Sequence, residues 1–138
     1  MSFEAWRFAT EEGKDPGGLL DSAAEQAPTR DRWACAAGCA HCCFLRVEVT
    51  EAEVERILPL VTPAIAVRVR EQAARPGARR RCALLGPDDR CLVYEQRPVR
   101  CRAHVSSDVG LCESVRAEQL PSGAVPGDSW LTRVADAV

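Results

Sequence analysis

The residues with the clearest chemistry are eight cysteines, which fall into two groups of four. The first group lies within nine residues and consists of Cys35, Cys39, Cys42 and Cys43. The second group is spaced at intervals of about ten residues and consists of Cys82, Cys91, Cys101 and Cys112. Thiols at this density either form disulfides or bind a metal as thiolates, and the redox compartment decides between the two.

The N-terminal residues predict a reducing compartment. Residues 1–14 contain five charged side chains, which interrupt the continuous apolar stretch that a secretory signal requires. No segment of the sequence approaches the ~20 apolar residues that span a bilayer. We therefore expect a cytoplasmic protein with no membrane partner, whose cysteines bind metal. A disulfide framework and a redox-active thiol set are the alternatives.

Composition agrees with a small domain that depends on metal. The chain has 138 residues but only three Phe, three Trp, one Tyr and one Met, so large apolar side chains are few. Small domains of this kind often take part of their folding free energy from a bound metal. The net charge is −2, and the basic run 79–81 has no interleaved aromatic residues, so there is no clear nucleic-acid partner. The sequence identifies no protein partner.

The cysteine spacing is compatible with zinc and with iron. Zinc sites commonly take four thiolates, whereas an iron–sulfur cluster usually takes three ligands from one short loop. The spacing of Cys35, Cys39 and Cys42 fits the second pattern as well as the first. Side chains of neighbouring residues diverge in an extended backbone, so we expect Cys42 and Cys43 to serve different sites or to bridge a polynuclear one. A further possibility is that Cys43 is a buried apolar thiol, and the partition of the cysteines stays open.

Two histidines are additional candidate donors. His41 lies inside the first group, and His104 follows the cysteine at position 101. Imidazole is a common ligand for zinc and iron. Eight thiols already suffice for two sites, so these histidines are alternatives to the cysteines.

The elements expected to position these cysteines form an α+β fold, a small metal-stabilised single domain. Residues 45–49 alternate apolar and polar side chains, which predicts a half-buried strand. Residues 82–85 and 91–94 flank the turn-rich sequence 86–89, which predicts a hairpin carrying two cysteines. Pairing of Leu85 with Arg90 would place Cys82 and Cys91 diagonally on one face.

Several short helices are expected around this hairpin. Thr50 and Glu53 form the pattern of a capping box, and Thr62 followed by proline predicts a second helix start. A helix capped by Ser107 or Asp108 is expected to run to about Leu120. The final helix is amphipathic and starts near Trp130, and a short, weak helix is expected over residues 19–27.

We therefore divide the chain into three parts. Residues 1–34 are expected to form a peripheral N-terminal arm, anchored mainly by Trp33. Residues 35–120 form the cysteine-cluster metal-binding domain. Residues 121–138 form a C-terminal loop and helix that pack on this domain.

Two stretches of the sequence resemble the YkgJ-type cysteine-cluster family of zinc- or iron-chelating domains. One stretch is the first cysteine group, residues 35–43. The other is residues 91–102, Cys-Leu-Val-Tyr-Glu-Gln-Arg-Pro-Val-Arg-Cys-Arg, which is similar to the family signature C-x-x-Y-x-x-R-P-x-x-C-R. The resemblance covers about residues 35–120 and implies metal chelation by the cysteines, with zinc or iron as cofactor.

Four residues of the signature are expected to support the cysteines. Arg97 and Pro98 restrict the backbone ahead of Cys101, because the residue before proline is held in an extended conformation. Tyr94 could cover one side of a site. Arg102 could donate a hydrogen bond to a sulfur or to a backbone carbonyl.

Three functions compete at this stage. The first is a non-enzymatic metal-binding protein that chelates zinc or iron through thiolates. The second is an iron–sulfur electron carrier or redox sensor. The third is a zinc- or thiol-dependent enzyme, which would need an open coordination position. No residues are assigned to catalysis.

Overall fold

The computed structural model describes residues 15–75, 77 and 80–137, and within them it is helical. The α-helices are α2 (Pro16–Glu25), α3 (Glu51–Ile57), α4 (Pro63–Ala74), α5 (Val99–Ala103), α6 (Val109–Arg116) and α7 (Ser129–Ala137). The single-turn 3-10 helices are η1 (Arg30–Arg32), η2 (His41–Phe44), η3 (Leu58–Leu60), η4 (Tyr94–Gln96) and η5 (Ser122–Ala124). None of the described helices is long and apolar enough to cross a membrane.

The expected α+β fold is wrong, because the described residues contain a single isolated bridge and no sheet. Residues 46–50 have no regular secondary structure, and their side chains are exposed. Val47 and Val49 are among the exposed apolar residues, so the alternation does not mark a half-buried face. A strand needs a partner for its backbone groups, and no described segment pairs with this one.

The expected hairpin is reduced to one bridge, which joins Leu85 to Cys91. The backbone N–H of Gly86 donates to the carbonyl of Arg90 at 2.8 Å, so the chain does reverse at the predicted turn. The pairing is shifted by one residue from the predicted register. Asp89, in this turn, has a positive φ of 58°. On both sides of the bridge the backbone forms further hydrogen-bonded turns, which prevent longer pairing.

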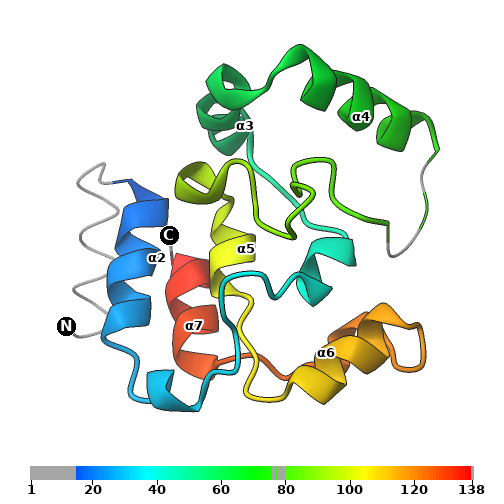
Figure 1. The fold of residues 1–138 in the computed structure, drawn as a ribbon. Coiled ribbons are helices and arrows are strands. Elements are labelled where there is room, and N and C mark those ends of the chain that lie inside the picture. Colours follow the sequence, from blue (N-terminus) through cyan, green and yellow to red (C-terminus); the bar gives the residue numbers. More distant parts are fainter. Residues whose placement is uncertain (1–14, 76, 78–79, 138) are drawn as a thin grey trace.

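The principal apolar core lies between α2 and α7, which pack side by side with α5 (Figure 1). Its buried residues are Leu20, Ala23, Val105, Leu131, Val134 and Ala135. Trp33 and Trp130 pack against this cluster. Residues 16–25 of the predicted peripheral arm therefore contribute fully buried side chains to the core.

Helix α2 begins earlier than expected, at a sequence that resembles a helix breaker. The Asp15 carboxylate accepts a hydrogen bond from the Gly18 N–H at 2.8 Å, and Pro16 occupies the first turn. Proline is tolerated there because the first N–H groups of a helix have no intrahelical partner. Residues 1–14 of the arm, Arg79 and Val138 lie outside the described residues.

The other helix starts agree closely with the sequence. Thr50 and Glu53 form the predicted capping box at the start of α3, and Thr62 caps α4. Asp108 caps α6 through the Leu111 N–H at 3.2 Å. Helix α6 ends at Arg116, before the predicted Leu120, and Glu118 adopts a positive φ of 61° directly afterwards.

Candidate metal centre

The first cysteine group and three later cysteines come from segments that lie around the short bridge. The Cys82 N–H donates to the Cys43 carbonyl at 2.8 Å, so the first cysteine group and the bridge segment lie side by side. Cys91 is held opposite Leu85 by the bridge itself. Cys101 lies in α5, and its pKa is raised first by burial and then by repulsion from Cys82, Cys43 and Cys91. We call Cys43, Cys82, Cys91 and Cys101 the bridge group.

Backbone N–H groups point at two sulfurs of the bridge group. The N–H groups of Leu84 and Leu85 act to lower the pKa of Cys82, and that of Val93 acts to lower the pKa of Cys91. These donors follow their cysteine by two or three residues, because the backbone turns immediately after each thiol. Such N–H donors favour a thiolate over a neutral thiol.

Burial opposes these donors. Desolvation is the largest influence on the thiols of Cys82, Cys91 and Cys101; it raises the pKa of all three, and that of Cys101 rises to about 12. The positive charge of Arg97 acts in the opposite direction on Cys91 and Cys101. A metal that binds here must displace these protons, so binding is expected to release them.

The other four cysteines lie where residues 35–43 meet α6. Cys35 accepts a hydrogen bond from the Ser106 N–H at 3.3 Å, which ties the start of the cluster to the segment before α6. The next cysteine, Cys39, closes a turn by donating its N–H to the Ala36 carbonyl at 3.0 Å. Gly38 has a φ of 87° in this turn, a conformation that glycine adopts readily.

Helix α6 brings Cys112 to this cluster, because it packs against η2, which contains Cys42. The pKa of Cys35 is raised, chiefly by burial. The hydrogen bond from Ser106 lowers it, and repulsion from Cys39 and Cys112 raises it further. The pKa of Cys42 is raised first by a hydrogen bond with Cys43 and by burial, and then by repulsion from Cys43, Cys101 and Cys35. We call Cys35, Cys39, Cys42 and Cys112 the α6 group.

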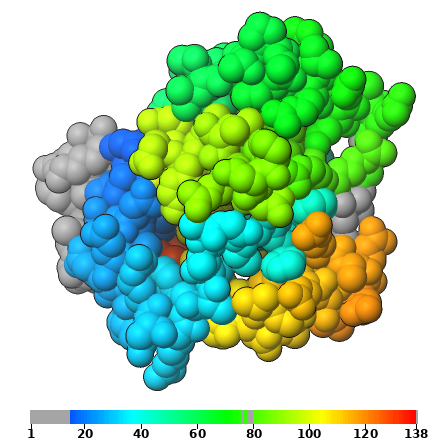
Figure 2. Space-filling model, viewed as in Figure 1, coloured from blue at the N-terminus to red at the C-terminus, as the bar shows by residue number. Residues whose placement is uncertain are grey.

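The two groups adjoin at the neighbouring thiols of Cys42 and Cys43. A hydrogen bond between these side chains raises the pKa of Cys42 and lowers that of Cys43 to about 7. The charge of Arg81 also favours the Cys43 thiolate. Figure 2 shows the segment around residues 35–43, in cyan, between residues 82–98 and α6 on one face of the molecule.

The thiols are gathered but not closed around a point. All eight cysteines are free, seven are partly buried and Cys35 is exposed. Among the described residues, no group of three or more His, Cys, Asp or Glu side chains is arranged to hold a metal ion as it stands. The donor chemistry fits zinc or iron, which bind thiolates once the thiols have lost their protons.

The histidines differ in their surroundings. His41 places Nε2 3.8 Å from the Glu113 carboxylate, while its Nδ1 atom is buried and has no hydrogen-bond partner among the described residues. His41 therefore has a nitrogen available for a ligand beside the α6 group. Burial lowers the pKa of His104, which favours its neutral imidazole.

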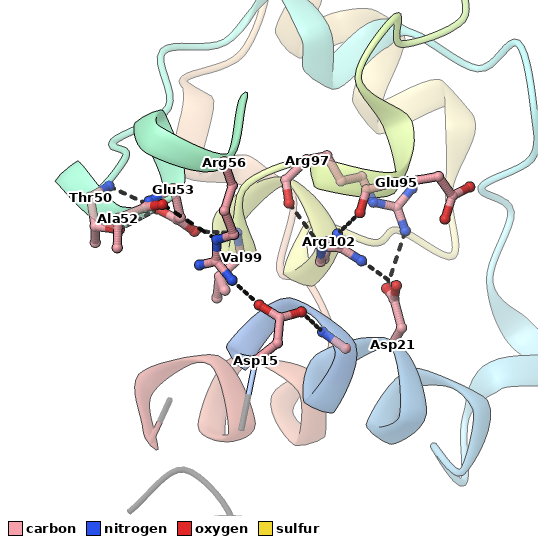
Figure 3. Close-up of polar contacts among 11 residues, drawn as sticks. Asp15, Asp21, Thr50, Ala52, Glu53, Arg56, Glu95, Arg97, Val99 and Arg102 are labelled. Carbon is pink, nitrogen blue, oxygen red and sulfur yellow. Dashed lines mark hydrogen bonds and ion pairs between the residues drawn. The ribbon is translucent and has the colours of Figure 1, made fainter. Parts of the chain in front are cut away.

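Arg102 binds backbone carbonyls rather than a sulfur. Its guanidinium donates to the carbonyl of Arg97 at 2.8 Å and to that of Glu95 at 2.6 Å, and it also pairs with Asp21 (Figure 3). The Arg102 side chain is only 5% exposed. A Cβ atom on Gly17 would lie 3.0 Å from Arg102 Nε, so α2 approaches the guanidinium closely. Arg102 thus fixes the turn before α5 against the core.

The other signature residues hold the same turn. Pro98 is buried and precedes α5. The Arg97 guanidinium lies 3.9 Å from the centre of the Tyr94 ring and 3.5 Å from Asp21. Tyr94 itself is 54% exposed. Its ring therefore covers the arginine, and the prediction that it covers a metal site stays a prediction.

Two supporting residues were not found from the sequence. Asp21 pairs with both signature arginines but lies 81 residues before Arg102, and no local pattern links them. Glu53 was recognised as part of a capping box, yet its second oxygen also accepts from the Val99 N–H at 2.7 Å. That bond connects α3 to the start of α5. The first N–H groups of a helix have no partner within the helix, and this general need for an acceptor is the signal that could have suggested the bond.

A small helical domain whose turns collect eight free thiols belongs to the class of cysteine-rich metal-binding domains. A family model supports this assignment: the CxxCxxCC family, described as "Putative zinc- or iron-chelating domain", matches residues 34–121. The chain belongs to this family, which confirms the resemblance found in the sequence. No curated protein and no solved structure matches the chain.

Proposed function

We propose that the chain is a non-enzymatic cytoplasmic protein that holds two metal ions in adjoining four-thiolate sites. The bridge group would hold one ion and the α6 group the other. The observation that supports this proposal is the packing of the segments that carry the thiols: the Cys82 N–H donates to the Cys43 carbonyl, while α6, which contains Cys112, packs against η2. Neighbouring residues 42 and 43 then serve different sites, and neither site requires a contorted loop.

Zinc is the metal that these sites suit best. Four thiolates close a tetrahedral zinc site, and a closed site has a structural role. When bound, zinc would cross-link turns that have few backbone hydrogen bonds of their own. Four thiolates around a divalent ion leave a net charge of −2, and Arg81 and Arg97 provide compensating charge beside the bridge group.

An iron–sulfur cluster in the α6 group is the second candidate. Three of its thiols come from one short loop and the fourth, Cys112, comes from a distant helix. This three-plus-one arrangement is typical of cluster ligation. Such a centre would change the role from structural support to electron transfer or sensing.

Anaerobic purification followed by metal analysis and an absorption spectrum tests the proposal. We expect a colourless protein with two zinc ions per chain. A brown protein with iron and acid-labile sulfide would instead support the cluster. A protein that binds neither metal when refolded with an excess of each would refute chelation by these cysteines.

A further inference from the structure

A cavity of about 400 Å³ lies between α4 and the segment that leads into Cys82. Among the residues that the structure describes, four arginines line it together with one acidic residue, Glu71. These arginines are Arg68, Arg75, Arg80 and Arg81. The chain as a whole has a net charge of −2, so this concentration of positive charge is local.

Hydrogen bonds from α4 hold the walls of the cavity together. The side-chain oxygen Oε1 of Gln72 accepts from the Ala83 N–H at 3.2 Å, and the side-chain nitrogen Nε2 of Gln72 donates to the Arg81 carbonyl. Arg68 reaches the Leu85 carbonyl at 3.5 Å. These bonds hold Gln72 and Arg68 of α4 against residues 81–85, on either side of the cavity.

The carboxylates nearby neutralise only part of this charge. Arg81 is paired with Asp89 at 2.8 Å and also donates to a backbone carbonyl. Within the described part of the chain, Arg68, Arg75 and Arg80 form no ion pair. Three arginines of the lining therefore have no described carboxylate within ion-pair distance, and the cavity should attract anions.

We propose that this cavity binds a small polyvalent anion that carries phosphate groups. Guanidinium groups bind phosphate oxygens through paired N–H donors, and several of them favour a ligand with more than one charge. The volume falls in the range of small-molecule sites, which start at about 300 Å³. Cys82 also lines the cavity, so the bound anion would lie beside the bridge group. The proposal does not depend on which metal the cysteines hold.

Calorimetric titration of the full-length, metal-loaded protein with inorganic pyrophosphate tests this inference. We expect saturable binding with one anion per chain that weakens as salt is added. Arg75→Gln combined with Arg80→Gln should weaken this binding by about tenfold or more, since two guanidinium partners are lost. Arg70→Gln is the matched control, because Arg70 is an exposed residue of the same helix and does not line the cavity.

Metal content measured after each titration separates binding in the cavity from removal of the metal by pyrophosphate. The inference is overturned if no saturable binding occurs while the metal is retained. It is also overturned if Arg70→Gln weakens binding as much as the cavity variant does. Binding of a Glu-rich peptide without binding of pyrophosphate would assign the cavity to an acidic protein segment and would likewise contradict the proposal.

Discussion

Replacing Glu53 with alanine should weaken the fold far more than its position on a short helix suggests. The carboxylate of this buried residue accepts hydrogen bonds from Thr50 N–H at 2.8 Å, Thr50 Oγ1 at 3.0 Å and Val99 N–H at 2.7 Å. The bond to the Val99 N–H is charge-assisted and contributes about 2 kcal/mol, and loss of the capping interaction adds about 1 kcal/mol. We therefore expect Glu53→Ala to lower the free energy of unfolding by about 3 kcal/mol.

The same carboxylate predicts a pH dependence. Burial would raise the pKa of Glu53, but the hydrogen bonds from Thr50 and Val99 outweigh it and the pKa is lowered. The folded state therefore gains stability above the ordinary pKa of a glutamate, about 4.3, and loses it as pH falls through the lowered value. Glu53→Gln should reduce this loss between about pH 5 and the acid transition.

Urea unfolding followed by circular dichroism, at a fixed excess of metal, measures both effects. Glu51→Ala is the matched control, because Glu51 is exposed in the first turn of the same helix and should cost about 0.5 kcal/mol. If Glu53→Ala costs no more than Glu51→Ala, the bond to Val99 does not join α3 to α5 and the reasoning is refuted.

Three further predictions concern Arg102, the bound metal and Asp128. Arg102→Lys should lower the free energy of unfolding by about 2–4 kcal/mol, because a lysine cannot donate to two carbonyls and to Asp21 together. A loss below about 0.5 kcal/mol would contradict this role. Removal of metal by a strong chelator should speed amide hydrogen exchange in residues 35–43 and 82–94, while the α2–α7 core stays protected. Unchanged exchange in a verified metal-free sample would contradict metal-dependent folding of these turns. Burial would raise the pKa of Asp128, but hydrogen bonds, first from Thr29 and then from Leu131, lower it. Asp128→Asn should therefore reduce the loss of unfolding free energy below about pH 4. An unchanged dependence of the unfolding free energy on pH in this range would refute this.

The helix starts were predictable because they depend on residues that are close in sequence. Thr50, Thr62 and Asp108 each cap a helix through an N–H three residues away. The strands were not predictable in the same way. Alternation over residues 45–49 is typical of a strand, but a strand forms only where another segment pairs with it, and pairing is a long-range property.

The site shows the same division between local and distant information. The cysteines themselves and their family were identified from spacing, and the match to residues 34–121 confirms the family. Their grouping depends on contacts such as Cys82 N–H to the Cys43 carbonyl, which joins residues that are far apart in the chain. Asp15 and Pro16 show that a local pattern can also mislead, because the same residues that break a helix can begin one.

Metal stoichiometry in two single-cysteine variants tests the central claim most directly. Native mass spectrometry of the wild-type chain, Cys101→Ser and Cys112→Ser would count the ions in each protein. Two separate four-thiolate sites predict two ions in the wild type and one in each variant. A chain with both substitutions should retain no ion at the metal concentration that saturates the wild type. If the wild type holds a single ion, or if either substitution removes both ions while the chain remains folded, the division into a bridge group and an α6 group is contradicted.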